Sequence, residues 1–138
     1  MVAVGAIIEN AKTGKILLLK RNSKADFSPG IWEEITGRMK QFEELEEALK
    51  GEIKEESSIE EINIVKPLTI NHFFRGERAA DKEIILIIYW CITEQEKVVI
   101  SGEHEDFAWL PPKEALSLVE HPGVKNDIET FIKEKYGR

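Results

Sequence analysis

The sequence predicts an α/β protein in which a mixed β-sheet lies between helices. A pair of short β-rich runs is followed by a helix at residues 44–56, two long strands and two C-terminal helices. This order favours helices packed on a sheet. The run ILLLK within residues 15–21 is apolar at consecutive positions, so both faces of its sheet should be covered. We therefore expect an α/β/α sandwich.

The remaining elements are predicted from apolar runs and from turn residues. The expected strands cover residues 2–9, 15–21, 62–74, 84–93 and 98–100, with a turn at 10–14 and a loop at 22–30. The run IILIIYWCI is apolar on both parities and predicts a central strand. Pro111 and Pro112 open a helix. Pro122 and Gly123 are expected to break the chain before an amphipathic helix at residues 124–136.

Composition limits the classes of protein to which the chain can belong. With 138 residues, we expect one domain over residues 1–138. The net charge of −7 argues against an extended nucleic-acid groove but is compatible with a small anionic ligand whose charge a metal ion balances. No membrane-spanning run and no secretory leader are evident, so we expect a cytoplasmic protein, either a monomer or a homodimer. The lone Cys91 is expected to be a buried hydrophobe.

The helix at residues 44–56 carries acids on its apolar side. Leu45, Leu49 and Ile53 form an ordinary core stripe at helical spacing. Glu52 and Glu56 point within roughly 20° of Leu45 on the helical wheel. A buried carboxylate costs several kcal/mol unless it is paired, protonated or bound to a cation. Either the helix turns these acids out to solvent after Leu49, or they hold a hard divalent cation such as Mg²⁺ or Mn²⁺.

The surrounding residues resemble the signature of the Nudix hydrolases. That signature reads Gly-x5-Glu-x7-Arg-Glu-aliphatic-x-Glu-Glu-x-Gly-aliphatic. The positions of this chain that match it are Gly37, Glu43, Glu52, Ile53, Glu55, Glu56 and Ile59. Gly51 stands in place of the arginine and Ser58 in place of the last glycine. The resemblance implies the Nudix-type α/β/α sandwich with a mixed sheet over essentially the whole chain.

The resemblance also implies a reaction and a cofactor. Nudix hydrolases cleave a nucleoside diphosphate linked to another moiety, including nucleoside triphosphates, with Mg²⁺ or Mn²⁺. Carried over by position, Glu52, Glu55, Glu56 and the Gly37 carbonyl are the implied metal ligands. Glu52 is the implied catalytic base, with Glu55 and Glu103 as the other candidates. Gly37 is also expected to adopt a backbone geometry that other residues avoid.

Three residues are candidates for substrate binding. Arg21, at the end of an early strand, and Arg38, beside the acidic helix, are candidates for the phosphates, although either fits an ordinary solvent-exposed charge. Phe74 is a candidate for the base pocket, although an edge or core aromatic is the favoured interpretation. Glu103 is equally compatible with a solvated loop acid. His104 is expected to be hydrogen-bonded rather than catalytic.

The two departures from the signature affect the expected activity. In the family the missing arginine fixes the catalytic carboxylates through charge-assisted hydrogen bonds. Glycine at position 51 also weakens the helix by roughly 1 kcal/mol relative to alanine. We expect metal binding to survive and turnover to be slowed. The alternative function is a catalytically weakened nucleotide-binding or sensor module of the same fold.

Overall fold

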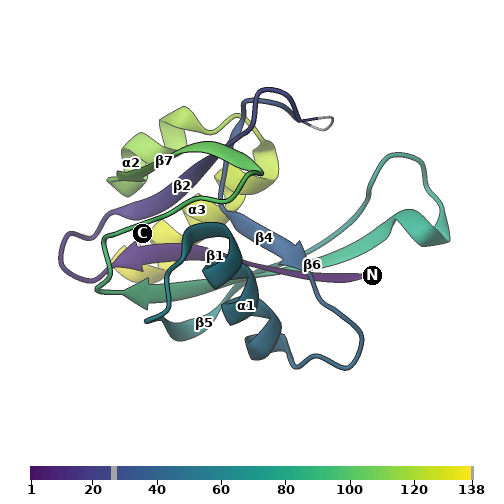
Figure 1. The fold of residues 1–138 in the computed structure, drawn as a ribbon, viewed down its shortest axis with the longest axis horizontal. Helices are drawn as coiled ribbons and strands as arrows, with labels where there is room; N and C mark the ends of the chain where they lie inside the picture. The colour runs from purple at the N-terminus through teal and green to yellow at the C-terminus, as the bar shows by residue number, and fades with distance from the viewer. Residues whose placement is uncertain (26–27, 138) are drawn as a thin grey trace.

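The computed structural model describes residues 1–25 and 28–137, which form one mixed sheet with helices on both faces (Figure 1). The strands are β1 (Val2–Asn10), β2 (Ile16–Arg21), β3 (Trp32–Glu33), β4 (Ile35–Arg38), β5 (Asn63–Phe74), β6 (Glu83–Thr93) and β7 (His104–Leu110). The helices are α1 (Leu45–Ser57), α2 (Pro112–Leu118) and α3 (Pro122–Tyr136), with a 3₁₀ turn at Ala80–Lys82. The predicted α/β class is confirmed.

The sheet divides where β1 and β2 separate. Its strand order is β3-β2-β1-β6-β5, while β4 also pairs with β1 and β7 also pairs with β2. β1 and β2 pair at Glu9 and Ile16; further along, β1 pairs antiparallel with β4 and β2 with β3. β7 pairs with β2 from Ile16 to Arg21 along its other edge. The pairing of β1 with β6 is parallel, so the sheet is mixed as predicted. β4 and the turn before β7, which are distant in sequence, both come close to α1.

Two apolar cores cover the two faces of the sheet. Leu49 and Ile53 of α1 pack in one core, and Ile128 and Phe131 of α3 pack in the other; all four are fully buried. Figure 1 shows α1 on one side of the sheet and α2 and α3 on the other. The α/β/α sandwich is therefore confirmed.

The run ILLLK of β2 shows why the continuous apolar pattern predicted a covered sheet. Leu17 and Leu19 belong to the core beneath α1, whereas Ile16 and Leu18 belong to the core beneath α2 and α3. Successive side chains of a strand point to opposite faces, so a strand covered on both sides needs apolar residues at every position. β6 is likewise central, between β1 and β5, and Cys91 within it is buried as expected.

Three local expectations differ from the structure or lie outside it. Residues 98–100 are not a strand, and Val99 instead donates its N–H to the Ser57 carbonyl at the end of α1 (3.0 Å). α3 begins at Pro122 rather than at 124, because His121 Nδ1 accepts the Gly123 N–H (3.0 Å) and proline suits the first helical turn. The predicted loop at residues 22–30 includes residues 26 and 27, which lie outside the described residues.

Within the described residues, no helix combines the length and the apolar character needed to cross a membrane.

Leu49→Ala tests the core that holds α1 on the sheet. The Leu49 side chain is fully buried, so its truncation should lower the free energy of unfolding by about 2–5 kcal/mol. Leu118→Ala is the matched control, because Leu118 is 38% exposed and its truncation should change stability by less than about 0.5 kcal/mol. Urea denaturation measures both. Equal small effects would show that α1 does not pack as described.

Candidate active site

The inward face of α1 carries two carboxyl groups in contact. Glu56 is only 4% exposed, Glu52 is partly buried, and their side chains are hydrogen-bonded to each other. Leu49 and Ile53, on the same side of the helix, are in the core. The apolar stripe therefore turns the acids toward the sheet, and of the two possibilities left open by the sequence the inward-facing one is found.

Gly37 makes room for Glu52. It lies in the middle of β4, opposite Val4 of β1, and its φ is not positive, so the expected unusual backbone geometry is wrong. The reason for glycine here is steric: a Cβ at this position would collide with the carboxyl group of Glu52. Gly37 thus lets α1 bring an acid directly onto the sheet.

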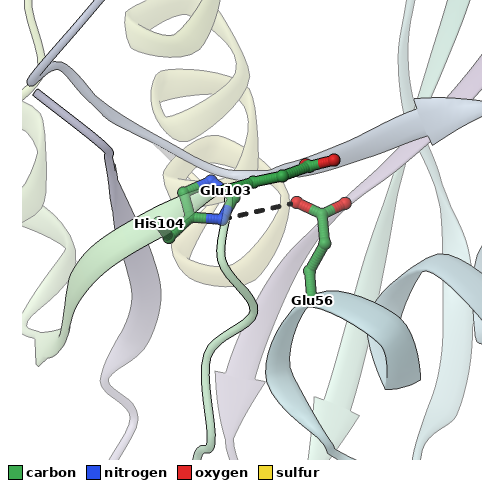
Figure 2. A group of neighbouring side chains, drawn as sticks. All are labelled: Glu56, Glu103 and His104. Carbon is green, nitrogen blue, oxygen red and sulfur yellow. Dashed lines mark ion pairs between the residues drawn. The ribbon is translucent and has the colours of Figure 1, made fainter. Parts of the chain in front are cut away.

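The turn before β7 brings a third acid and a histidine to Glu56. Oxygen atoms of Glu56 and Glu103 and a ring nitrogen of His104 all lie within 4.8 Å of one another. Figure 2 shows the His104 ring facing the Glu56 carboxylate, with Glu103 alongside; Nδ1 is 3.9 Å from Glu56 Oε1. Glu105 instead accepts the Ser23 N–H (2.6 Å) and pairs with Lys20 (3.4 Å). Glu103 is therefore the acid of this turn that reaches α1.

The crowding of these acids raises two pKa values. Burial, followed by the charges of Glu52, Glu103 and Glu33, raises the pKa of Glu56 from 4.5 to about 9. Burial and then the charge of Glu55 also raise the pKa of Glu52, while its hydrogen bond with Glu56 opposes that rise. At neutral pH and without a cation, Glu56 is therefore protonated and donates to Glu52.

Glu33 is a site residue that the sequence did not single out. Its Oε2 atom lies 2.9 Å from His104 Nε2 and 3.4 Å from Arg21 Nη1. β3 and β7 flank β2 on its two edges, which brings Glu33 and His104 together across 71 residues of chain. A Trp-Glu pair in a short run carries no signal for this contact, because it depends on the pairing of three strands.

Glu52 and Glu55 open onto a cavity beside the loop that precedes α1. The cavity has a volume of about 390 Å³ and is lined by Lys40, Glu43, Ala48, Gly51, Glu52, Lys54 and Glu55. Glu55 is exposed, on the flank of the helix, as expected. Glu43 holds the loop, since its Oε1 accepts the Lys40 N–H (2.7 Å). Of the predicted metal ligands, Glu52 and Glu56 are thus in contact, whereas Glu55 faces the open side.

The predicted substrate-binding residues lie in three different places. Arg21 pairs with Glu33, the residue that also contacts His104 Nε2. Arg38, at the exposed end of β4, lines a second cavity of about 430 Å³ with Arg75 and Lys82. Phe74 ends edge strand β5 and has the Arg78 guanidinium 5.5 Å from its ring centroid. Phe74 fits the expected edge aromatic, and the substrate roles of the three remain predictions.

A separate pair of acids is buried on the opposite face. Glu34 and Asp127 are each 2% exposed, and Thr69 Oγ1 donates to Asp127 Oδ1 (2.7 Å). Burial, followed by a hydrogen bond with Asp127, raises the pKa of Glu34 well above its usual value. Asp127 belongs to α3, so this pair lies across the sheet from α1. It is a hydrogen-bonded contact between Glu34, which joins β3 to β4, and α3, and it is not part of the α1 cluster.

The cluster on α1 has the donor set that a divalent cation needs. Glu52, Glu56 and Glu103 supply carboxylate oxygens, which suit hard divalent cations. His104 Nδ1 is buried and has no hydrogen-bond partner. An orphaned nitrogen beside a carboxyl with a strongly raised pKa is a site that positive charge would satisfy. The residues present therefore fit a cation.

The raised pKa of Glu56 predicts a pH-dependent stability of the metal-free protein. The folded state favours the protonated acid, so this contribution is fully present below pH 4.5 and is lost as the pH rises toward about 9. Glu56→Gln, which keeps a neutral side chain, should remove that part of the pH dependence. Thermal unfolding in a chelator between pH 5 and 9 measures it. Parallel curves for the wild type and the variant would contradict the proposed burial of Glu56.

Comparison with known proteins identifies the family. The model of the NUDIX domain matches residues 1–133. CTP pyrophosphohydrolase of Escherichia coli is 30% identical over 130 residues, covering 94% of this chain and 89% of the relative. Nucleoside triphosphatase NudI of an Enterobacter species is 34% identical over 110 residues, covering 75% and 77%.

Solved structures show the same fold. The E. coli ORF135 protein has a TM-score of 0.77 at 27% identity, covering 99% of this chain and 91% of that one. The MutT protein of Methanosarcina mazei has a TM-score of 0.79 at 23% identity, covering 100% and 96%. The chain therefore belongs to the Nudix family, and with it to the hydrolases of diphosphate bonds.

Proposed function

We propose that this chain hydrolyses a nucleoside diphosphate linked to another moiety, that nucleoside triphosphates are its substrate class, and that Mg²⁺ or Mn²⁺ is its cofactor. One observation carries the proposal: Glu56 is buried against Glu52, Glu103 and His104, a concentration of acids that a cation would balance. The matched relatives that cover most of the chain are named as a CTP pyrophosphohydrolase and a nucleoside triphosphatase, which supports the substrate class.

The acids of α1 divide into deep and accessible groups. Glu56 is buried and has a pKa of about 9. It is therefore better suited to binding a cation than to exchanging protons with solvent as a general base. We assign Glu52, Glu55, Glu56 and the Gly37 carbonyl as residues that would hold the cation. When bound, the cation supplies Lewis acidity at the phosphate oxygens. Glu103 approaches the same group from the β7 side.

Glu52 is the best placed general base. It touches Glu56 on its inner side and lines the 390 Å³ cavity on its outer side. It therefore joins the proposed cation group to the open cavity in which a water can be placed. In the proposed step, a water oxygen bonds to phosphorus, its proton passes to Glu52, and the bond to the bridging oxygen breaks. For a nucleoside triphosphate the products are a nucleoside monophosphate and pyrophosphate.

Basic side chains surround the acids at the surface. Lys40 and Lys54 line the cavity of Glu52, while Arg38 and Lys82 line the second cavity at the end of β4. Such charges attract and position phosphate groups. We propose that the substrate phosphates lie between these two cavities. Arg38, which follows Gly37 in β4, would contact them from the second cavity. Arg21 would then act on the site through Glu33.

Glu52→Gln tests the assigned base. Removing a general base typically lowers the rate by about 10²–10⁴-fold, so we expect that loss in kcat with a panel of nucleoside triphosphates and nucleoside diphosphate derivatives. Phosphate or pyrophosphate release with Mg²⁺ measures it. Glu47→Gln, on the exposed face of the same helix, is the matched control and should retain activity. Saturable nucleotide binding without product from any panel member would support a sensor module instead.

Gly51→Arg tests the departure from the family signature. A Cβ at Gly51 would have no other atom within 4 Å, and the position lines the cavity with Glu52 and Glu55. An exposed charge pair contributes about 0.2–1 kcal/mol, so kcat should rise about 1.4- to fivefold. Gly51→Ala separates charge from helix propensity: it should stabilise the fold by about 1 kcal/mol and leave kcat unchanged. An equal rise in both variants would contradict the assigned role of the charge.

A further inference from the structure

His104 is buried in an arrangement that leaves one ring nitrogen without a partner. The residue is 4% exposed, and its Nε2 atom lies 2.9 Å from Glu33 Oε2. Its Nδ1 atom is buried and makes no hydrogen bond. A buried polar atom without a hydrogen-bond partner destabilises the fold, so a ligand at this nitrogen would be favourable.

The contacts of Glu33 determine which nitrogen carries the proton. The Glu33 Oε2 atom also faces the Arg21 guanidinium (3.4 Å), which can only donate. Glu33 therefore acts as the acceptor, and His104 Nε2–H donates to it. In the neutral ring, Nδ1 then presents a lone pair. That lone pair points toward Glu56 of α1.

The atoms nearest to Nδ1 on the α1 side are carboxyl oxygens, and none is close enough to form a hydrogen bond with it. Glu56 Oε1 is 3.9 Å away, too far for a hydrogen bond, and a Glu103 oxygen lies within 4.8 Å of both groups. Figure 2 shows all three side chains converging from α1 and from the start of β7. A histidine whose second nitrogen donates to a carboxylate is the usual form of a metal-ligating imidazole.

We propose that His104 Nδ1 is a nitrogen ligand of the cation that Glu56 would hold, on the side that Glu103 approaches, and that Glu33 orients the ring. The inference rests on the cation dependence proposed above and adds a ligand to the carboxylates of α1. An imidazole nitrogen favours transition metals over Mg²⁺, whose preferred ligands are oxygens. The site is therefore expected to prefer Mn²⁺ to Mg²⁺, and His104→Asn to reduce that preference.

Pulsed electron paramagnetic resonance on the Mn²⁺-loaded protein tests the ligand directly. The chain has three histidines, so a His72→Gln/His121→Asn variant retains His104 alone. His72 pairs with Glu83 and His121 caps α3, and neither belongs to the cluster. Labelling this variant with ¹⁵N-histidine should replace a ¹⁴N coupling to Mn²⁺ with a ¹⁵N coupling. This comparison leaves His104 intact and does not depend on the folding of a His104 variant.

A second measurement gives the size of the effect. His104→Asn should abolish the nitrogen coupling and weaken Mn²⁺ binding by on the order of tenfold to a hundredfold in calorimetric titration. Mn²⁺ binding with spectra that are identical in the ¹⁴N and ¹⁵N samples would overturn the nitrogen ligand while leaving the proposed function intact. Absence of Mn²⁺ binding together with metal-independent hydrolysis would overturn both.

Discussion

The burial of Glu56 among other acids is the constraint on which the rest of the site depends. A carboxyl that is 4% exposed and close to Glu52 and Glu103 cannot remain charged there without compensation. Without a cation, a proton on Glu56 provides the compensation. In the proposed function a bound cation would take the place of that proton, so metal binding would be linked to the protonation state of the site.

The fold keeps these acids together against their mutual repulsion. Leu49 and Ile53 fix the rotation of α1, and the missing side chain at Gly37 lets Glu52 approach β4. From the other side, pairing of β2 with both β3 and β7 holds the His104–Glu33 contact. The same apolar packing that stabilises the sandwich thus holds the charged groups in place. Loss of that packing would release them to solvent.

The sequence was sufficient for the parts of the site that lie close together along the chain. The spacing of Glu52 and Glu56 against Leu45 placed both acids on the apolar side of the helix, because one helix fixes all three positions. It left their direction open, and the structure shows the inward one. The continuous apolar run of β2 predicted a sheet covered on both faces for a similar local reason.

Contacts across the sheet were beyond the reach of such reasoning. The hydrogen bond from His104 to Glu33 requires knowledge of strand order, and Glu33 gave no local sign of it. Gly37 was expected to need glycine for its backbone angle, but its neighbour Glu52 is what excludes a side chain there. The start of α3 was misplaced because a histidine, rather than a usual capping residue, accepts the Gly123 N–H.

Anomalous diffraction from Mn²⁺-soaked crystals would show whether a cation binds beside Glu56. The convergence of Glu56, Glu103 and His104 predicts an anomalous peak within bonding distance of both carboxylates and of His104 Nδ1. The cation site would be contradicted if crystals with saturating Mn²⁺ showed no peak at this cluster and had Glu52 and Glu56 directed into solvent.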